Sequence, residues 1–477
     1  MLPCYLIVNS KTLYNNFRKA FPWEPTQDQE KGLRSLANLI HPEENINLEI
    51  DVFILRGYAG TGKTTLVQSI ARGAESDGWR SVLGAPTGRA AKVLQGAWGC
   101  RAWTLHRLLY VSVRSPDGIF KRIARKNRGQ KLIFIIDEAS MISDSGENGQ
   151  ILKDLLNFVK SGKNCKLILV GDQAQLPPIG QSYSPALDSQ VLLHSYGVKS
   201  SGISLHKVMR QSENSGILHC ATELRQALFS ESSFFPTLKP NKEVLFIKDP
   251  QELYETLESC FCNSENDAVI ITRSNKRAIS YNEQIRSQLL GYEDVLNAGD
   301  LVMVVQNNDR WLADNDSSGF IANGDLLEIR SWRNEEHKYG LHFADATLSW
   351  RDIEAEPFEA KIILDTLRSP FTRLSEAQIK LLNSHLLNES NNLGLSKLSR
   401  SDFLKNHPYG QALQLKFGYA LTAHKAQGGQ WREVFVERPY TDDPSNEEYI
   451  RWMYTSFTRA KDKLYLIGFT EATPVDN

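Results

Sequence analysis

Glycine, lysine and threonine residues at a fixed spacing have the chemistry to hold a nucleoside triphosphate. Residues 57–64 read GYAGTGKT, a complete G-x-x-x-x-G-K-[ST] pattern directly after the apolar run 52–55. In this pattern the glycines let backbone N–H groups point at phosphate oxygens, Lys63 reaches the β- and γ-phosphates, and the Thr64 hydroxyl ligates Mg²⁺. Because a chance match is expected in only about one chain in fifty of this length, the stretch predicts a phosphate-binding loop.

Two adjacent carboxylates follow a second apolar run. Residues 131–136 (KLIFII) are typical of a strand buried on both faces, and Asp137 and Glu138 come directly after it. Acids at such an edge are costly to place unless a cation or a proton transfer uses them. We therefore interpret Asp137 as a residue of the magnesium shell and Glu138 as the group that polarises the attacking water. After a third such strand, Gln175 can hydrogen-bond the γ-phosphate.

Two further strands are followed by polar residues at the expected edge of the same sheet. Thr87, Arg89 and Lys92 come after the predicted strand 80–85 and could hold a phosphodiester, although a helix N-cap with two solvated basic residues is equally compatible. Residues 103–106 (WTLH) bring an indole, the Thr104 hydroxyl and His106 to the start of a short helix. Since most tryptophans lie in protein cores, base stacking is the less favoured interpretation there.

Two residues far apart in the chain have both a structural and a functional interpretation. Gln29 lies just after Thr26, a candidate N-cap, and its amide can both donate and accept, as reading an adenine edge requires. Capping the helix is the alternative for this glutamine. Arg459 stands in a T-R-A sequence and is either a surface arginine or an arginine finger directed at the transferred phosphate.

The composition is that of an ordinary globular protein without an excess of either charge. The chain has 477 residues, enough for about three domains, and 55 Lys and Arg against 56 Asp and Glu give a net charge of -1. Nucleic-acid binding would therefore depend on local patches. Six scattered cysteines without metal spacing suit free thiols in a reducing compartment, and no stretch has the length of a membrane span, so we expect a soluble cytoplasmic protein.

The strand pattern predicts an α/β fold with two parallel sheets and two insertions. A second parallel sheet begins near residues 268–273, and the helix 274–290 follows it. Residues 111–123 read as a hairpin around an S-P-D-G turn and are followed by basic residues. From residue 299, short strands separated by Asn, Asp and Gly turns predict a small antiparallel barrel with a helix-rich extension near 375–404, and the α/β pattern resumes at residue 417.

Eight ordered motifs resemble those of the superfamily 1B DNA helicases, the branch that contains the RecD and Dda helicases. They are GYAGTGKTT, APTGRAAKVL, TLHRLL, IIDEASM, GDQAQLPPIG, VMRQ, YALTAHKAQG and YTSFTRAK. The resemblance covers nearly the whole chain. It implies two RecA-like P-loop domains with ATP and Mg²⁺ between them, single-stranded DNA across both, and movement in the 5′ to 3′ direction. It also implies that the barrel is the 2B insertion and that the hairpin is the 1B pin, which separates strands in many relatives.

The resemblance assigns a role to each matching residue and a boundary to each domain. The implied catalytic residues are Glu138, Asp137, Lys63, Arg210, Arg459 and Gln175. The implied ATP-binding residues are Gln29, Gly57, Gly60, Thr61, Gly62, Lys63, Thr64, Thr65 and Gly428, and the implied metal ligands are Thr64 and Asp137. The implied DNA-binding residues are Thr87, Arg89, Lys92, Thr104, His106, Thr422, His424 and Lys425. The implied domains are 1A (1–109 and 132–208), 1B (110–131), 2A (209–299 and 412–477) and 2B (300–411).

One position departs from the family pattern, and two other functions remain open. Many relatives have an acid that contacts the ribose where this chain has Gln430, so that contact is in doubt here. The main hypothesis is a monomeric ATP-driven helicase acting on single-stranded DNA and on junctions with duplex DNA. The alternatives are a nucleotide-gated DNA-binding or remodelling ATPase without strand separation, and a P-loop phosphotransferase whose turnover is indifferent to DNA.

Overall fold

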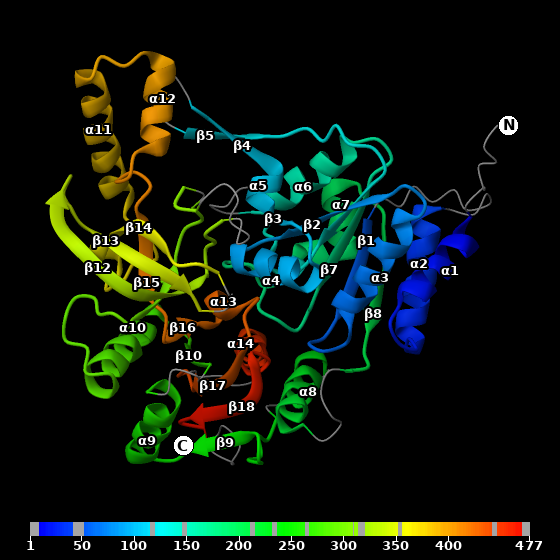
Figure 1. The fold of residues 1–477 in the computed structure, drawn as a ribbon. Helices are drawn as coiled ribbons and strands as arrows, with labels where there is room; N and C mark the ends of the chain where they lie inside the picture. Colours follow the sequence, from blue (N-terminus) through cyan, green and yellow to red (C-terminus); the bar gives the residue numbers. More distant parts are fainter. Residues whose placement is uncertain are drawn as a thin grey trace. The chain divides into compact units, whose positions relative to one another are not determined.

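The chain forms two compact units, seen in the computed structural model of Figure 1. The structure describes residues 9–41, 52–114, 120–145, 150–209, 215–230, 236–262, 267–308, 310–312, 320–351, 355–440 and 446–469. The first unit comprises residues 1–86, 90–113 and 121–218, and the second comprises 87–89, 114–120 and 219–477. No described helix is long and apolar enough to cross a membrane.

The first half of the chain alternates strands and helices, as the sequence predicts for an α/β fold. Thr26, the candidate N-cap, does cap the second helix. The elements are α1 (Ser10–Ala20), α2 (Gln27–Ile40), β1 (Val52–Gly57), α3 (Lys63–Glu75), β2 (Arg80–Ala85), α4 (Gly88–Trp98), β3 (Ala102–Thr104), α5 (Leu105–Leu109), β4 (Tyr110–Arg114), β5 (Phe120–Ala124), β6 (Leu132–Ile136), η1 (Ala139–Met141), α6 (Ile151–Lys160), β7 (Lys166–Gly171), η2 (Pro185–Leu187), α7 (Ser189–Tyr196) and β8 (Ser200–Leu205).

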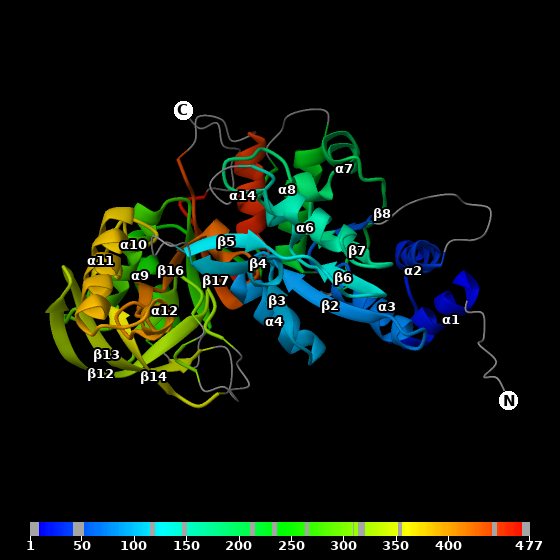
Figure 2. The ribbon, with the colours of Figure 1, turned by 90° about the horizontal axis from the view of Figure 1, so that it is seen from above.

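Six of these strands form a parallel sheet with a hydrophobic core on each face. Their order is β3-β2-β6-β7-β1-β8, and β1 lies between β7 and β8. Phe53 and Leu55 of β1 pack with α1, α2 and α3, whereas Val52 and Ile54 pack with α6 and α7 on the other face. Figure 2 shows the same unit from above. Since all strands are parallel, their carboxyl ends share one edge, where the predicted site residues follow β1, β2, β6 and β7.

The second half contains another parallel sheet and the predicted barrel. Its elements are α8 (Gly216–Phe229), β9 (Val244–Ile247), α9 (Pro250–Phe261), β10 (Ala268–Thr272), α10 (Asn275–Gln284), η3 (Ile285–Leu289), β11 (Leu301–Val304), β12 (Leu326–Lys338), β13 (Leu341–Trp350), β14 (Phe358–Ile363), η4 (Leu364–Thr366), α11 (Glu376–Asn392), α12 (Lys397–Asn406), β15 (Leu413–Phe417), β16 (Ala420–Thr422), α13 (Ala423–Ala426), β17 (Trp431–Glu437), α14 (Glu447–Phe457) and β18 (Ala460–Ile467). The sheet order is β16-β10-β17-β18-β9. The predicted α/β class with a hairpin sheet, β4-β5, and a small barrel is confirmed.

The closed barrel β11-β12-β13-β14-β15 differs in two details from the expected antiparallel barrel. β14 and β15 pair in parallel, with Ile362 opposite Leu413, because the chain passes through α11 and α12 between them. β15 also lies beyond residue 411, the predicted end of the insertion. The long hairpin β12-β13 turns at Tyr339 and Gly340, which both have positive φ, as a two-residue hairpin turn requires.

A buried ion pair fixes the barrel to the helix that precedes it. The predicted helix 274–290 is present, but its last part is the π-helical segment η3. Within that segment Arg286 donates from Nε to Asp300 Oδ1 at 2.8 Å and from Nη2 to Oδ2 at 2.9 Å, and both side chains are almost fully buried. Because removing one partner would leave a buried charge uncompensated, this bidentate pair is expected to hold the start of β11 in place.

The helical extension is attached to the barrel through a group of aromatic and charged side chains. Tyr339 donates to Glu389 on α11 at 2.6 Å, and Tyr409 donates to Glu336 on β12 at 2.7 Å. Nε2 of His407, a mostly buried residue, lies 3.8 Å from Glu389. Burial lowers the pKa of His407, and this effect exceeds the opposing attraction of Glu389. The imidazole is therefore held in its neutral form by the fold.

The stability of the protein is expected to fall as the pH is lowered from 7.5 to 5. The unfolded chain binds a proton at the histidine near pH 6.5, whereas the folded chain binds it only at lower pH, so acid favours unfolding. His407→Gln should reduce the difference in melting temperature between the two pH values, measured by thermal unfolding. The exposed His194 provides the control, since His194→Gln should leave that difference unchanged. Equal pH dependence in His407→Gln and the wild type would contradict the assignment.

Candidate nucleotide site and nucleic-acid interface

The phosphate loop follows β1 and leads directly into α3. Gly60 and Gly62 have φ values of 78° and 82°, a left-handed conformation that glycine adopts without a steric cost. A Cβ atom on Gly57 would lie 2.6 Å from Thr61 Oγ1, so the start of the loop has no room for a side chain. The first N–H groups of α3 thus have the positive end of the helix dipole behind them, the arrangement that binds phosphate.

Lys63 and Thr64 begin α3. Lys63 Nζ donates to the carbonyl oxygens of Gly57, at 2.7 Å, and Tyr58, at 2.9 Å, so the ammonium group lies over the loop that it is predicted to serve. The Thr64 and Thr65 side chains belong to the same first turn and are partly exposed. The Thr64 hydroxyl is therefore a suitable magnesium ligand, both in its chemistry and in its place at the start of α3.

Gln29 is both a helix-capping residue and a support of the phosphate loop. Its Oε1 accepts from the backbone N–H of Thr26 at 2.9 Å, and its own N–H donates to Thr26 Oγ1 at 3.2 Å, which is a complete capping box. Its Nε2 donates to the Thr61 carbonyl at 3.1 Å. The capping interpretation is confirmed. Recognition of adenine by Gln29 stays a prediction. The side-chain amide has one further N–H hydrogen and one further oxygen lone pair with which it could bond the base.

The acidic pair lies at the end of β6, and its backbone is strained. Glu138 has a φ of 51°, a conformation that non-glycine residues rarely adopt and that is concentrated at functional sites. Its N–H donates to Asp137 Oδ1 at 2.8 Å. Burial raises the pKa of Asp137, while that hydrogen bond and the charge of Lys63 oppose the rise. A half-buried carboxylate with little positive charge around it is a fitting ligand for Mg²⁺, which would supply that charge.

The loop after β7 carries Gln175 in a fixed conformation. Asp172 Oδ1 accepts from the N–H of Ala174 at 2.9 Å, and the Asp172 carbonyl accepts from the N–H of Gln175 at 3.3 Å. This turn resembles the Asx turns that aspartate forms at strand ends. Gln175 itself is 4% exposed. The structure thus brings the phosphate loop, the acidic pair and Gln175 to one edge of the first sheet, within one unit.

The predicted DNA-binding residues of the first half follow the next strands of the sheet. Thr87 follows β2, Arg89 and Lys92 lie on α4, and Thr104 is the last residue of β3. Thr104 Oγ1 accepts from the N–H of Arg107 at 3.3 Å, so this hydroxyl caps α5. His106 lies on α5. Whether these residues contact DNA stays a prediction.

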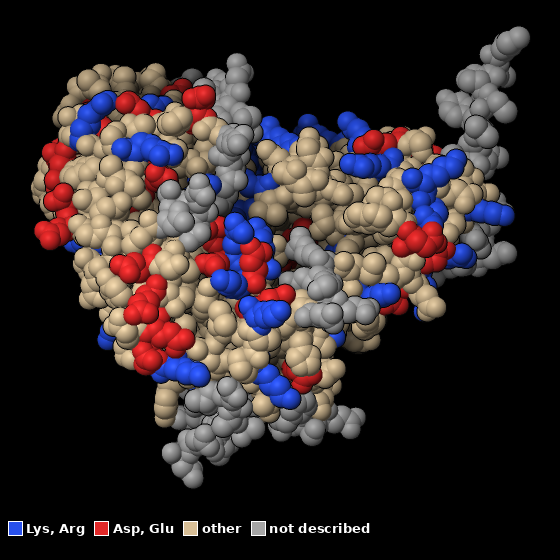
Figure 3. Space-filling model, turned by 60° about the horizontal axis from the view of Figure 1, so that its bottom comes forward, with Lys and Arg blue, Asp and Glu red and all other residues tan. Residues whose placement is uncertain are grey.

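The indole ring of Trp103 packs against two arginine side chains. The guanidinium groups of Arg101 and Arg107 lie 4.1 and 5.6 Å from the ring centroid. These cation–π contacts agree with the interpretation that base stacking is not its main role. On the face shown in Figure 3, basic and acidic side chains are interspersed, as the net charge of -1 predicts.

The second unit carries the remaining predicted DNA residues. Thr422 ends β16 and precedes α13, which contains His424 and Lys425. Burial lowers the pKa of both His424 and Lys425, so their charged forms are desolvated. Burial and the charge of Lys425 also lower the pKa of Lys416 to about 8. All three basic groups are at least partly buried, and contact with a phosphate would raise their pKa values.

Arg459 has hydrogen bonds within its own unit. Its Nε donates to the Thr455 carbonyl at 3.0 Å, Nη1 to the Gly429 carbonyl at 3.2 Å and Nη2 to Thr458 Oγ1 at 3.1 Å. Gly428, with a φ of 78°, makes the turn that presents the Gly429 carbonyl. Arg459 therefore joins the end of α14 to the loop after α13. Its contact with a γ-phosphate stays a prediction.

Two features of the site were not predicted. Arg210 lies outside the described residues, but the N–H of Met209 directly before that gap donates to the Gly60 carbonyl at 2.8 Å. Arg56 donates from β1 to the carbonyl of Leu187, 131 residues away. Its signal in the sequence is a charged side chain inside an otherwise apolar strand, VFILRG.

Two family models match the chain, one in each half. The model described as "AAA domain" matches residues 44–232, and the model described as "UvrD-like helicase C-terminal domain" matches residues 417–467. The first contains the phosphate loop, the acidic pair and Gln175. The second contains Thr422, Gly428 and Arg459, so both sets of predicted site residues lie inside a matched region.

Two curated relatives and one solved structure are similar to this protein. The "ATP-dependent RecD2 DNA helicase" of Deinococcus radiodurans is 34% identical over 171 residues, which are 35% of this chain and 21% of that protein. The "RecBCD enzyme subunit RecD" of Buchnera aphidicola subsp. Schizaphis graminum is 22% identical across 94% of this chain and 76% of its own length. A Pif1 helicase from Bacteroides, solved with ADP-AlF3 and ssDNA, is 16% identical with a TM-score of 0.49, and the match covers 95% of each chain.

The matched segment of this chain thus spans about a fifth of the RecD2 protein and about three quarters of RecD. The two matched models occur in the order that the eight motifs predict, an ATPase region followed by a helicase C-terminal region. Together with the RecD-type relatives, they confirm the resemblance of this chain to the superfamily 1B helicases of the RecD-like branch.

Proposed function

We propose that the protein is an ATP-dependent DNA helicase that moves 5′ to 3′ on single-stranded DNA and unwinds duplex DNA. The observation that carries this proposal is the combination at one sheet edge of a phosphate loop, a strained acidic pair and a buried glutamine. These are the parts that ATP hydrolysis needs. The second parallel sheet and Arg459 favour a DNA-coupled motor, because a phosphotransferase that acts on a small acceptor does not need a second sheet of this kind.

Each group of the first unit has a task in hydrolysis. The N–H groups at the start of α3 and the ammonium of Lys63 hold the phosphates. Thr64 and Asp137 would hold Mg²⁺, which supplies positive charge to the β- and γ-phosphate oxygens. Glu138 accepts a proton from the attacking water, and Gln175 hydrogen-bonds the γ-phosphate or that water. Loss of the γ-phosphate then removes a partner of Gln175, and this loss is the signal for a conformational change.

Movement along DNA follows if the two units grip the strand with different strengths in each nucleotide state. Arg459 would attract the second unit to the γ-phosphate that Arg210 also contacts, and hydrolysis would end that attraction. Lys92, Thr104 and His106 of the first unit would contact the strand, and so would Thr87, Arg89, Thr422, His424 and Lys425 of the second unit. Because such contacts are mainly to the backbone, binding should weaken with salt and depend little on sequence.

The first test is the rate of ATP hydrolysis with and without single-stranded DNA. We expect a large stimulation by DNA and a steady-state rate that falls as salt weakens DNA binding. Strand displacement on duplexes with a 5′ or a 3′ single-stranded tail then measures polarity. Unwinding of the 5′-tailed substrate alone supports the proposal. A rate that is indifferent to DNA would exclude a DNA-coupled motor, and a preference for the 3′ tail would reverse the direction.

Removal of the hairpin β4-β5 distinguishes the helicase from the alternative, a nucleotide-gated DNA-binding or remodelling ATPase without strand separation. Replacing residues 111–123 by a short turn should abolish strand displacement and leave DNA-stimulated ATPase near the wild-type rate. The base of the hairpin supports this cut, because the N–H of Arg125 donates to the Leu109 carbonyl at 2.7 Å and can close the shortened loop. Normal unwinding by the deletion variant would show that the hairpin is not the element that separates the strands.

A further inference from the structure

Arg56 is a cation in the last part of β1, directly before the phosphate loop. It lies on the sheet face that packs with α6 and α7, where its strand neighbour two residues earlier is Ile54. Its guanidinium donates to the carbonyl oxygen of Leu187 twice, from Nε at 2.9 Å and from Nη2 at 2.7 Å. Nη2 also donates to Ser189 Oγ at 3.2 Å. Three donations thus go to one short segment, residues 184–189, which we name the bracket.

The bracket also contacts the two other strands that carry the hydrolysis residues. Ser184 Oγ donates to the carbonyl of Ser140 at 3.0 Å, two residues after Glu138. Gln173 Nε2 lies 3.4 Å from the Leu187 carbonyl, two residues before Gln175. The bracket is therefore bonded to the ends of β1, β6 and β7 together.

Packing leaves the bracket little freedom to move. A Cβ atom on Gly171, the last residue of β7, would lie 2.8 Å from the Leu187 side chain and 3.1 Å from the Ser140 nitrogen. Leu187 is fully buried in the core on this face. A small displacement of the bracket would therefore be passed to both β6 and β7, because close-packed interiors transmit strain.

A charged side chain is a costly choice for this position. Burial lowers the pKa of Arg56, and the charge of Asp188 opposes this effect, although a guanidinium stays protonated at neutral pH. An aliphatic residue would fill a strand position against an apolar core at lower cost. What an aliphatic residue cannot do is donate several hydrogen bonds in one plane, and the planar guanidinium fork does this.

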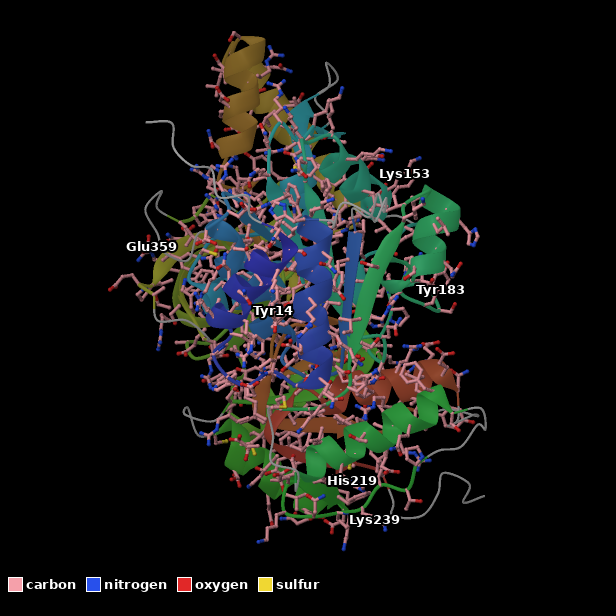
Figure 4. The ribbon with its side chains drawn as sticks, turned by 90° about the vertical axis from the view of Figure 1, so that its right-hand side faces the viewer. Tyr14, Lys153, Tyr183, His219, Lys239 and Glu359 are labelled. Carbon is pink, nitrogen blue, oxygen red and sulfur yellow. The ribbon has the colours of Figure 1, made fainter. Side chains whose placement is uncertain are left out.

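We propose that Arg56 is a positioning residue for ATP hydrolysis, which acts by holding the bracket against the ends of β1, β6 and β7. This inference rests on the proposed ATPase function of the same site. Through the bracket, the phosphate loop after β1, the acidic pair after β6 and Gln175 after β7 keep one relative geometry. The loop between Gln175 and the bracket reaches the surface, where Tyr183 is 48% exposed (Figure 4).

The test compares kcat and KM for ATP in Arg56→Met, Arg56→Lys and Ser184→Ala. A displacement of catalytic groups by about 1 Å can cost 100-fold in rate, so we expect Arg56→Met to lower kcat by roughly 10- to 100-fold. The dissociation constant of a fluorescent ATP analogue should change little, because the Arg56 guanidinium donates to Leu187 and Ser189, outside the phosphate loop. Arg56→Lys should recover part of kcat, and Ser184→Ala should lower it less than Arg56→Met does.

Matched controls separate positioning from a general loss of stability. Arg34→Met removes an exposed, paired arginine of the same unit, and Ser76→Ala removes another serine that donates to a backbone carbonyl, that of Gly73. Both should retain the wild-type kcat. The inference is overturned if Arg56→Met and Ser184→Ala keep the wild-type kcat, or if Arg56→Met lowers only the melting temperature. If the wild type itself hydrolyses no ATP, the proposed function fails instead.

Discussion

Glu138→Gln is expected to lower the rate of DNA-stimulated ATP hydrolysis by about 10²- to 10⁴-fold, the usual contribution of a general base. The amide keeps the size and most of the hydrogen-bonding capacity of the carboxylate but cannot take a proton from water. The loss corresponds to about 3 to 5 kcal/mol of transition-state stabilisation. Nucleotide binding should be preserved, because the phosphates are held by the first turn of α3 and Lys63. Steady-state kinetics and titration with a fluorescent ATP analogue measure the two effects separately.

The strained backbone of Glu138 makes a second substitution informative. Glycine adopts a φ of 51° without the strain that other residues carry in this conformation. Glu138→Gly should therefore preserve or raise the melting temperature, although it removes the catalytic base. A variant that is as stable as the wild type and catalytically inactive would show that strain is maintained for function. Glu75→Gln, at an exposed position on α3 of the same unit, is the control. Retention of more than half of the wild-type rate by Glu138→Gln would remove Glu138 from the base role.

The parts of the site that the sequence predicts are those built from residues close together in the chain. The phosphate loop depends on glycines within eight positions, and the cap of α2 depends on Thr26 and Gln29, three residues apart. Both are local conformational preferences, which short patterns record. The acidic pair was found for a similar reason, since an apolar strand that ends in two carboxylates is conspicuous within a single stretch of sequence.

The parts that escaped prediction depend on contacts between distant residues. Arg56 meets Leu187 only because the fold places the end of β1 beside the segment after β7. In the same way, β15 closes the barrel by a parallel pairing with β14 across two intervening helices. A strand's own residues predict that it is buried, but they do not specify its partner or direction. The left-handed backbone of Glu138 was also missed, because its local sequence has no glycine to mark it.

Arg459→Ala is expected to lower the DNA-stimulated rate of hydrolysis by about 10³-fold while nucleotide binding is retained, if Arg459 acts as an arginine finger. The guanidinium would stabilise negative charge that develops on the γ-phosphate in the transition state, so its loss affects turnover more than ground-state affinity. Arg459→Lys should recover little, since a lysine lacks the planar fork. The rate with saturating single-stranded DNA and the affinity for a fluorescent ATP analogue are the two measurements.

The hydrogen bonds of Arg459 provide a competing explanation that the same experiment separates. In the structure this side chain joins the end of α14 to the Gly429 carbonyl, so its loss could merely loosen the second unit. A structural role predicts a lower melting temperature and weaker DNA binding, with the remaining ATPase activity still stimulated by DNA. Arg432→Ala, which removes an exposed arginine paired with Asp462 in the same unit, controls for the loss of a positive charge. Because these hydrogen bonds are lost in either case, some decrease in melting temperature is expected, and catalysis by Arg459 requires that stimulation by DNA disappears while the folded variant still binds DNA and nucleotide.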